Sequence, residues 1–97
     1  MALSNVQTRY LRGLAHQLKP VVYLGQKGVT PSVLAELDAA LAVHELVKVK
    51  LAGEREAKAG LIETLARESR AEVVQKIGHV VTLYRRNAEK PRLALPD

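Results

Sequence analysis

The stretch Gly25-Gln26-Lys27-Gly28 combines the residue types that can hold an anion. Glycines leave backbone N–H groups uncovered and let the chain turn tightly, so a phosphate group can approach closely. Lys27 adds a full positive charge, and the helix expected to begin at Thr30-Pro31 adds the free N–H groups of its first turn. Two glycines around a turn usually serve only the turn. Their position between an apolar segment and a helix start favours a binding site for one or two phosphates of a sugar-phosphate backbone.

A second candidate lies on the first expected helix. At about 100° per residue, its basic side chains fall within one narrow arc. They are Arg9, Arg12, His16 and Lys19. The arc is roughly opposite an apolar stripe that we expect to be buried, namely Leu3, Val6, Tyr10, Leu14 and Leu18. A solvated helix face normally mixes charges of both signs, whereas this arc has no acidic residue.

The segment from Leu46 to Leu51 alternates as a strand does. Its valines are expected on the core face, and Lys48 and Lys50 on the other. The two lysines are either an ordinary outer strand face or part of the same basic surface. Arg85 and Arg86, at the end of the last expected strand, could extend that surface.

Charge is unevenly distributed along the chain. The 97 residues have a formal net charge of +5, and the first acidic residue is Glu36. Residues 54–72 mix both signs, and the C-terminal quarter is basic again. This layout favours one basic face and a polyanionic partner, although a basic protein need not have one.

The elements that must position these residues follow from periodicity and from start and stop signals. Ser4 and Gln7 form a capping box that opens the first helix, which should end before Pro20. We expect a buried strand at 21–24, a helix from Thr30-Pro31, a strand at 46–51, a helix at 54–70, and strands at 72–77 and 80–85 joined by Gly78-His79. The order α-β-α-β-α-β-β predicts an α/β two-layer sandwich with a four-stranded mixed sheet.

Signals for catalysis, metals and cofactors are poor. The chain has no cysteine, and its three histidines, His16, His44 and His79, show no ligand-like spacing. The glycine loop lacks the Lys-Ser/Thr ending of a phosphate-binding P-loop. We therefore expect no enzyme, no metal, no cofactor and no small-molecule substrate. Without Phe or Trp, an aromatic platform for stacking bases is not expected either.

Nothing in the sequence indicates a membrane or export. Apolar runs are short and interrupted by charges, and no signal peptide is visible. A cytoplasmic location is the default expectation.

Three stretches together resemble the CRM domain, in the stand-alone bacterial form known as the YhbY family. They run from Leu14 to Gly28, from His44 to Lys50 and from Ile77 to Arg85. The resemblance extends from about Leu3 to Arg86, so we expect a domain at 1–86 and a tail at 87–97. It implies a fold similar to the C-terminal domain of translation initiation factor three. It also implies RNA binding through the Gly25–Gly28 loop and the neighbouring basic surface.

Bacterial members of that family are associated with precursors of the large ribosomal subunit. The leading hypothesis is therefore a non-enzymatic protein that binds ribosomal RNA during ribosome assembly. The alternative is a ribosome-associated interaction module whose basic face docks an acidic protein. A phosphate-handling enzyme is a weaker third reading, because no acid-base pair supports it.

Overall fold

The computed structural model describes residues 3–25, 27–52, 55–91 and 93–96, and only the backbone of residues 55–59. The elements are α1 (Asn5–Ala15), β1 (Val22–Leu24), α2 (Pro31–His44), β2 (Leu46–Leu51), α3 (Arg55–Ser69), β3 (Glu72–Ile77) and β4 (Val80–Tyr84). Their order is the predicted one, and the predicted starts of α1 and α2 are confirmed. The predicted start of α3, at Glu54, lies outside the described residues. Ser4 and Gln7 close a capping box, and Thr30 caps α2 ahead of Pro31.

The four strands form one mixed sheet in the order β1-β2-β4-β3. Strand β1 pairs with β2 in parallel, and β4 pairs with both β2 and β3 in antiparallel fashion. The hairpin of β3 and β4 turns at Gly78, which has a φ of 58°. Strand β4 therefore lies between β2 and β3, an arrangement that helix-separated strands alone did not predict.

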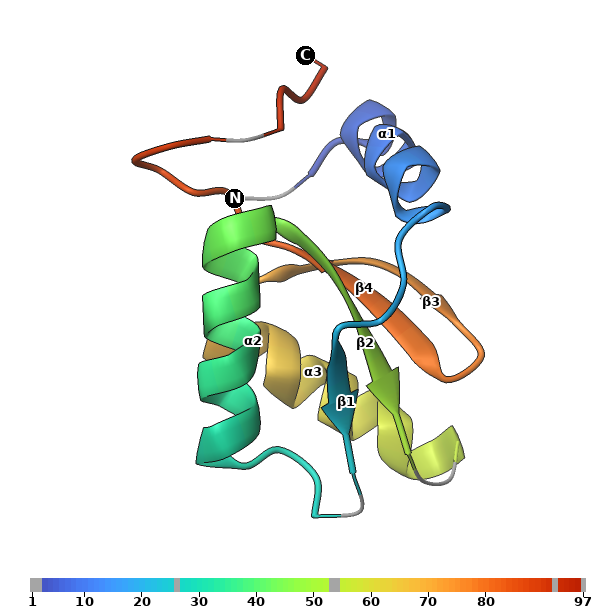
Figure 1. Cartoon of the computed structure of the whole chain (residues 1–97). Helices are drawn as coiled ribbons and strands as arrows, with labels where there is room; N and C mark the ends of the chain where they lie inside the picture. Colours follow the sequence, from blue (N-terminus) through green and yellow to red (C-terminus); the bar gives the residue numbers. More distant parts are fainter. Residues whose placement is uncertain (1–2, 26, 53–54, 92, 97) are drawn as a thin grey trace.

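Helices α2 and α3 cover one face of the sheet (Figure 1). The inner positions of β2 are Val47, Val49 and Leu51, and all three are buried there. Helical spacing in the sequence predicts an apolar inner face for each helix, namely Val33, Leu34, Leu37, Ala40 and Leu41 in α2 and Ala57, Leu61, Ile62, Leu65 and Ala66 in α3. The members whose side chains are described lie in this main core or pack against it, which confirms the prediction for them. Ala57, also predicted to lie on the inner face of α3, is outside the residues whose side chains are described.

Helix α1 packs on the opposite face, over one end of the sheet (Figure 1). Its buried residues are Leu11 and Ala15, which lie against Leu46, Val74 and Tyr84. The predicted buried stripe is wrong, since its members are exposed or only partly buried: Leu3, Val6, Tyr10, Leu14 and Leu18. The true inner face is offset by one residue, or about 100° around the helix. Small Ala15 lets the helix approach the sheet closely.

Strand β1 is an edge strand with one covered face. Val22 and Leu24 are buried in the main core, whereas Val21 and Tyr23 are 50% and 62% exposed. The prediction of a buried strand therefore holds for one face only. An apolar run of four residues is too short to show whether its second face is covered.

The C-terminal tail packs back on the domain. Leu93 and Leu95 lie against the cluster under α1. The buried carboxylate of Glu45 accepts hydrogen bonds from the N–H groups of Asn87, at 2.6 Å, and Leu93, at 2.7 Å. Glu45 has a φ of 62°, so the strained end of α2 also anchors the tail.

Candidate nucleic-acid interface

The glycine loop is a closed turn. The N–H of Gly28 donates to the carbonyl of Gly25 at 3.1 Å, so this amide is not available to a phosphate. Gly28 has a φ of 73°, and a Cβ there would lie 3.4 Å from the Leu61 side chain. A Cβ on Gly25 would meet nothing within 4 Å. Gly28 is therefore needed for the turn, whereas Gly25 leaves an open approach to the loop.

Lys27 is exposed in this turn, and no ion pair or hydrogen bond joins its side chain to another described residue. Gln26, the remaining loop residue of the prediction, lies outside the described residues. The cation at this turn is therefore available to a ligand.

The first turn of α2 offers little to an anion. The Thr30 hydroxyl already accepts from the N–H of Val33 at 3.2 Å, and Pro31 has no N–H. Within the described part of the chain, this leaves the N–H of Ser32 without an acceptor. The positive end of the helix still faces the loop side, and an N-terminal dipole favours an anion nearby. Lys27 therefore contributes the full positive charge beside this helix end.

Lys48 and Lys50 lie on the face of the sheet that α2 and α3 leave open, because the intervening Val49 points into the main core. Lys50 is exposed and Lys48 is half-buried. Neither ammonium group has an ion pair with a described residue. Two residues along a strand place their Cα atoms about 6–7 Å apart. The pair therefore forms a short row of positive charge beside β1.

The predicted cations of the first helix differ in their contacts. Arg12 donates from Nε to the carbonyl of Val74 at 3.3 Å, so it also ties α1 to β3. Arg9 and His16 are exposed, and His16 caps the helix. Lys19 follows the helix and, with Lys48, lines a groove of about 400 Å³ between the end of α1 and β2.

The loop and α1 lie at opposite ends of the sheet (Figure 1). The predicted site residues thus do not form one compact patch. Lys48 and Lys50 lie on the strand that runs between the two ends, next to β1. A ligand that contacts all three groups has to be an extended chain, and it has to cross the open face of the sheet.

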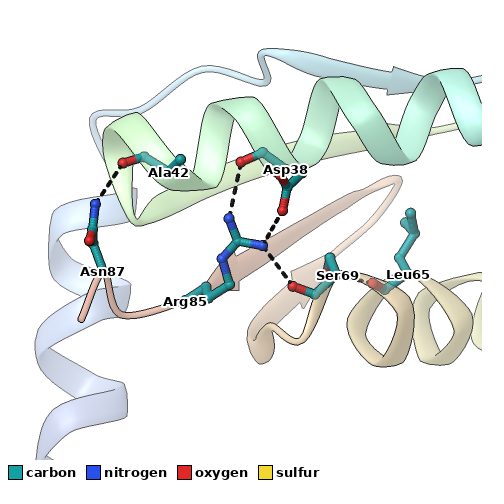
Figure 2. A network of polar contacts seen from close by, with 6 residues as sticks. All are labelled: Asp38, Ala42, Leu65, Ser69, Arg85 and Asn87. Carbon is teal, nitrogen blue, oxygen red and sulfur yellow. Dashed lines mark hydrogen bonds and ion pairs between the residues drawn. The ribbon is translucent and has the colours of Figure 1, made fainter. Parts of the chain in front are cut away.

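Arg85 is on the other face of the sheet and belongs to the scaffold (Figure 2). Its guanidinium group donates to the Asp38 carboxylate at 2.6 Å and to the carbonyls of Asp38 and Ser69 at 3.1 and 3.0 Å. It therefore joins the end of β4 to α2 and to the end of α3. Arg86 is exposed beside it in sequence, and we assign it no contact.

The sequence analysis did not predict that apolar side chains would be exposed on the open face of the sheet. Tyr23 and Ile77 are 62% and 63% exposed, at the two edges of the sheet. No local signal was available for Tyr23, because residues 21–24 are all apolar and the edge position of β1 depends on the order of the sheet. Among the described residues, no helix is long and apolar enough to cross a bilayer, and no three metal-ligating side chains gather.

The sequence matches a known protein family over most of its length. The family model of the CRS1 / YhbY (CRM) domain matches residues 3–85. The chain belongs to this family. The match confirms the resemblance carried by the three sequence stretches, and it includes the loop, α1 and the whole sheet.

The similar proteins agree in name and in fold. An "RNA-binding protein" of Haemophilus influenzae is 50% identical over 95 residues, which are 97% of this chain and 95% of that protein. The "Probable RNA-binding protein YqeI" of Bacillus subtilis is 36% identical over 97% of this chain and 99% of that protein.

A Staphylococcus aureus protein solved in solution and proposed to bind RNA shares 35% identity and a TM-score of 0.84, covering 98% of this chain and all of that chain. This likeness confirms the predicted α/β fold. The relatives are named as RNA-binding proteins and not as enzymes, which confirms the expectation that this CRM-family chain is not an enzyme.

Proposed function

We propose that this protein binds RNA through the sugar-phosphate backbone, along a path from the Gly25–Gly28 loop across the open sheet face to α1. The observation that carries the proposal is that three lysines along this path lack ion-pair partners. Lys27, Lys48 and Lys50 have no ion-pair partner among the described residues. Arg85, on the opposite face, is already bound to Asp38. Unpaired cations in a row can neutralise phosphates at no cost to internal bonds.

We further propose that the ligand in the cell is ribosomal RNA in precursors of the large ribosomal subunit. The family membership and the names of the relatives support RNA as the partner. The loop and α1 are separated by the length of the sheet (Figure 1). This separation supports a folded or extended RNA segment over a single small phosphate compound.

The salt dependence of binding tests the electrostatic mode. If about four to six phosphates are engaged, log affinity falls against log salt with a slope of about −3 to −5. The variant Lys27→Ala should weaken all RNA sequences alike and reduce the magnitude of that slope by about one, because a phosphate contact has little sequence information. Fluorescence anisotropy with labelled RNA at several salt concentrations measures both.

Stronger variants test the loop and the sheet face separately. We expect the double change Gln26→Asp with Lys27→Asp, and the double change Lys48→Ala with Lys50→Ala, each to weaken binding further than Lys27→Ala. Lys90→Ala removes the same charge from the exposed tail and should leave affinity almost unchanged. Loop variants that fold and bind RNA like the wild type would show that the loop is only a turn.

The alternative function, docking to an acidic protein, has one observation in its favour. The α1 side chains of Val6, Tyr10 and Leu14 are exposed, and Leu14 borders the groove that Lys19 and Lys48 line. Salt weakens this kind of binding too. Binding to purified RNA without protein separates the two functions, and crosslinking the protein to RNA in cells identifies the RNA.

A further inference from the structure

Tyr23 stands out among the three tyrosines of the chain. It is 62% exposed, against 40% for Tyr10 and 2% for Tyr84. A tyrosine ring left in water forgoes the burial by which aromatic side chains usually stabilise a fold. The exposure follows from the register of β1, since Val22 and Leu24 are both buried in the main core. The strand can satisfy its two inner positions only by presenting the residue between them to the open face.

The neighbour of Tyr23 on the open face is a lysine. In the parallel pairing of β1 and β2, Tyr23 lies directly opposite Lys50. Paired residues of adjacent strands project to the same side of the sheet, so the ring and the ammonium group share one surface. Lys48 comes one step further along that surface. Helix α1 covers the other end of the sheet, around Leu46 and Tyr84.

The surroundings of the ring are held by the main chain. The Tyr23 hydroxyl lies 3.4 Å from the carbonyl oxygen of Pro20, a long contact at an exposed position. The N–H of Val21 donates to the carbonyl of Lys48 at 3.1 Å and continues the pairing beyond the strand. The main chain around Tyr23 is therefore fixed by its pairing with β2, which does not depend on the hydroxyl.

The position along the chain connects this ring to the loop. Tyr23 precedes Gly25 by two residues, and Gly25 leaves the approach to the loop open. A nucleotide on the sheet face could thus place its base on the ring. The phosphates on either side of that base would then be directed to Lys50 and toward Lys27. Bases inside a duplex cannot reach an aromatic ring in this way, because they are already stacked on one another.

We propose that Tyr23 is a stacking site for one unpaired base, so that the sheet face takes single-stranded RNA next to the loop. The inference rests on the proposed function and makes it more specific. Every base has a π-face, so the site contributes affinity for single strands without a choice of base. It is one stacking position and not a platform, which agrees with a chain that has no Phe or Trp.

The test compares a short unstructured RNA strand with a duplex of the same sequence, using fluorescence anisotropy on the full chain. Tyr23→Leu keeps an apolar residue that fits a strand and removes the aromatic face. We expect it to weaken single-strand binding about fivefold to tenfold, the lower part of the range for one stacked base. Duplex affinity should not change. Tyr23→Phe keeps the ring and should bind both probes as the wild type does.

Two controls make the result specific. Tyr10→Leu makes the same change at an exposed tyrosine of α1 and should leave single-strand affinity unchanged. Replacing the bases of the RNA strand by abasic sites should abolish the difference between wild type and Tyr23→Leu. Tyrosine fluorescence gives a second measurement, because the chain has no tryptophan. Single strands should quench it in the wild type and much less in Tyr23→Leu.

The outcomes separate the inference from the function on which it rests. Equal single-strand affinity of wild type and Tyr23→Leu, or an equal loss on duplex RNA, overturns the stacking site while RNA binding stands. A loss shared by Tyr23→Phe overturns it as well, since the ring is still present. Wild-type protein that binds neither probe overturns the proposed function itself.

Discussion

The two faces of strand β2 differ in what they contact. On one face Val47, Val49 and Leu51 are buried under α2 and α3. On the other, Lys48 and Lys50 face a surface that α1 covers at one end only. The two sets alternate along the same six residues. A single strand can therefore hold the core together and present unpaired charge, because successive side chains point to opposite sides.

The same division separates two kinds of cation. Arg85 on the helix side uses its donors on Asp38 and Ser69, so its charge is already paired with a carboxylate of the same molecule (Figure 2). The lysines of the open face make no such bond to described residues. Net charge alone does not distinguish these roles, although both kinds of cation contribute equally to the +5 of the chain.

The largest expected effect comes from placing an aspartate at adjacent positions of β2, one on each face. Val49→Asp places a carboxylate in the main core without a partner, which typically costs more than about 4 kcal/mol and should unfold the domain. Lys50→Asp makes the neighbouring change on the open face and should alter the unfolding free energy by less than about 0.5 kcal/mol. RNA affinity should fall strongly in that variant. Urea denaturation and anisotropy measure the two quantities; a folded, RNA-binding Val49→Asp variant would contradict the assignment of faces.

An intermediate effect is expected from Arg85→Ala. The variant loses hydrogen bonds to two carbonyl groups and the pair with the exposed Asp38 carboxylate, so we expect about 1–2 kcal/mol of lost stability. RNA affinity should be unchanged, even though the variant loses as much charge as Lys50→Ala. Lys50→Ala is the matched control and should behave in the opposite way, with lower affinity and unchanged stability. If Arg85→Ala binds RNA as weakly as Lys50→Ala, the basic surface extends to the helix side.

The smallest effect concerns the covered end of the open face. Tyr84 is buried under α1, and within the described structure its hydroxyl has no hydrogen-bond partner. An unsatisfied buried hydroxyl costs free energy, so Tyr84→Phe should be neutral or more stable by up to about 1 kcal/mol. Thermal unfolding at neutral pH measures the change. A clear loss of stability would show that the hydroxyl makes a bond in solution.

The pH dependence of stability in the wild type and in Tyr84→Phe gives a second measurement. Burial raises the pKa of Tyr84 above its usual 10.0, the Glu45 carboxylate raises it further, and Arg86 opposes the shift. Above pH 10.0 the unfolded chain therefore loses this proton before the folded chain does. Stability falls as pH rises from there toward the raised value, because the unfolded state then binds fewer protons. Tyr84→Phe should lack this part of the alkaline loss.

The position of α1 was the main error of sequence interpretation. Its apolar stripe contains larger side chains than its true inner face, so hydrophobicity alone selects the wrong side. The packing on Leu46, Val74 and Tyr84 instead selects Leu11 and the small Ala15. Strand β1 was misjudged for a related reason, since its edge position depends on the order of the sheet. Both errors concern how elements far apart in the chain pack against each other, which no local sequence pattern specifies.

Local chemistry along the chain was enough to determine the elements and their starts. The capping box at Ser4, the Thr30-Pro31 helix start and the alternation of β2 all depend on near neighbours in sequence. The Gly25–Gly28 turn is likewise local, since glycine is the residue type that most readily adopts the positive φ of Gly28. Only the tertiary structure decided that β4 lies between β2 and β3, that Arg85 is paired with Asp38, and that Tyr23 shares a surface with Lys50. These facts depend on contacts between residues far apart in the chain, where packing and geometry select among arrangements that the local sequence permits equally.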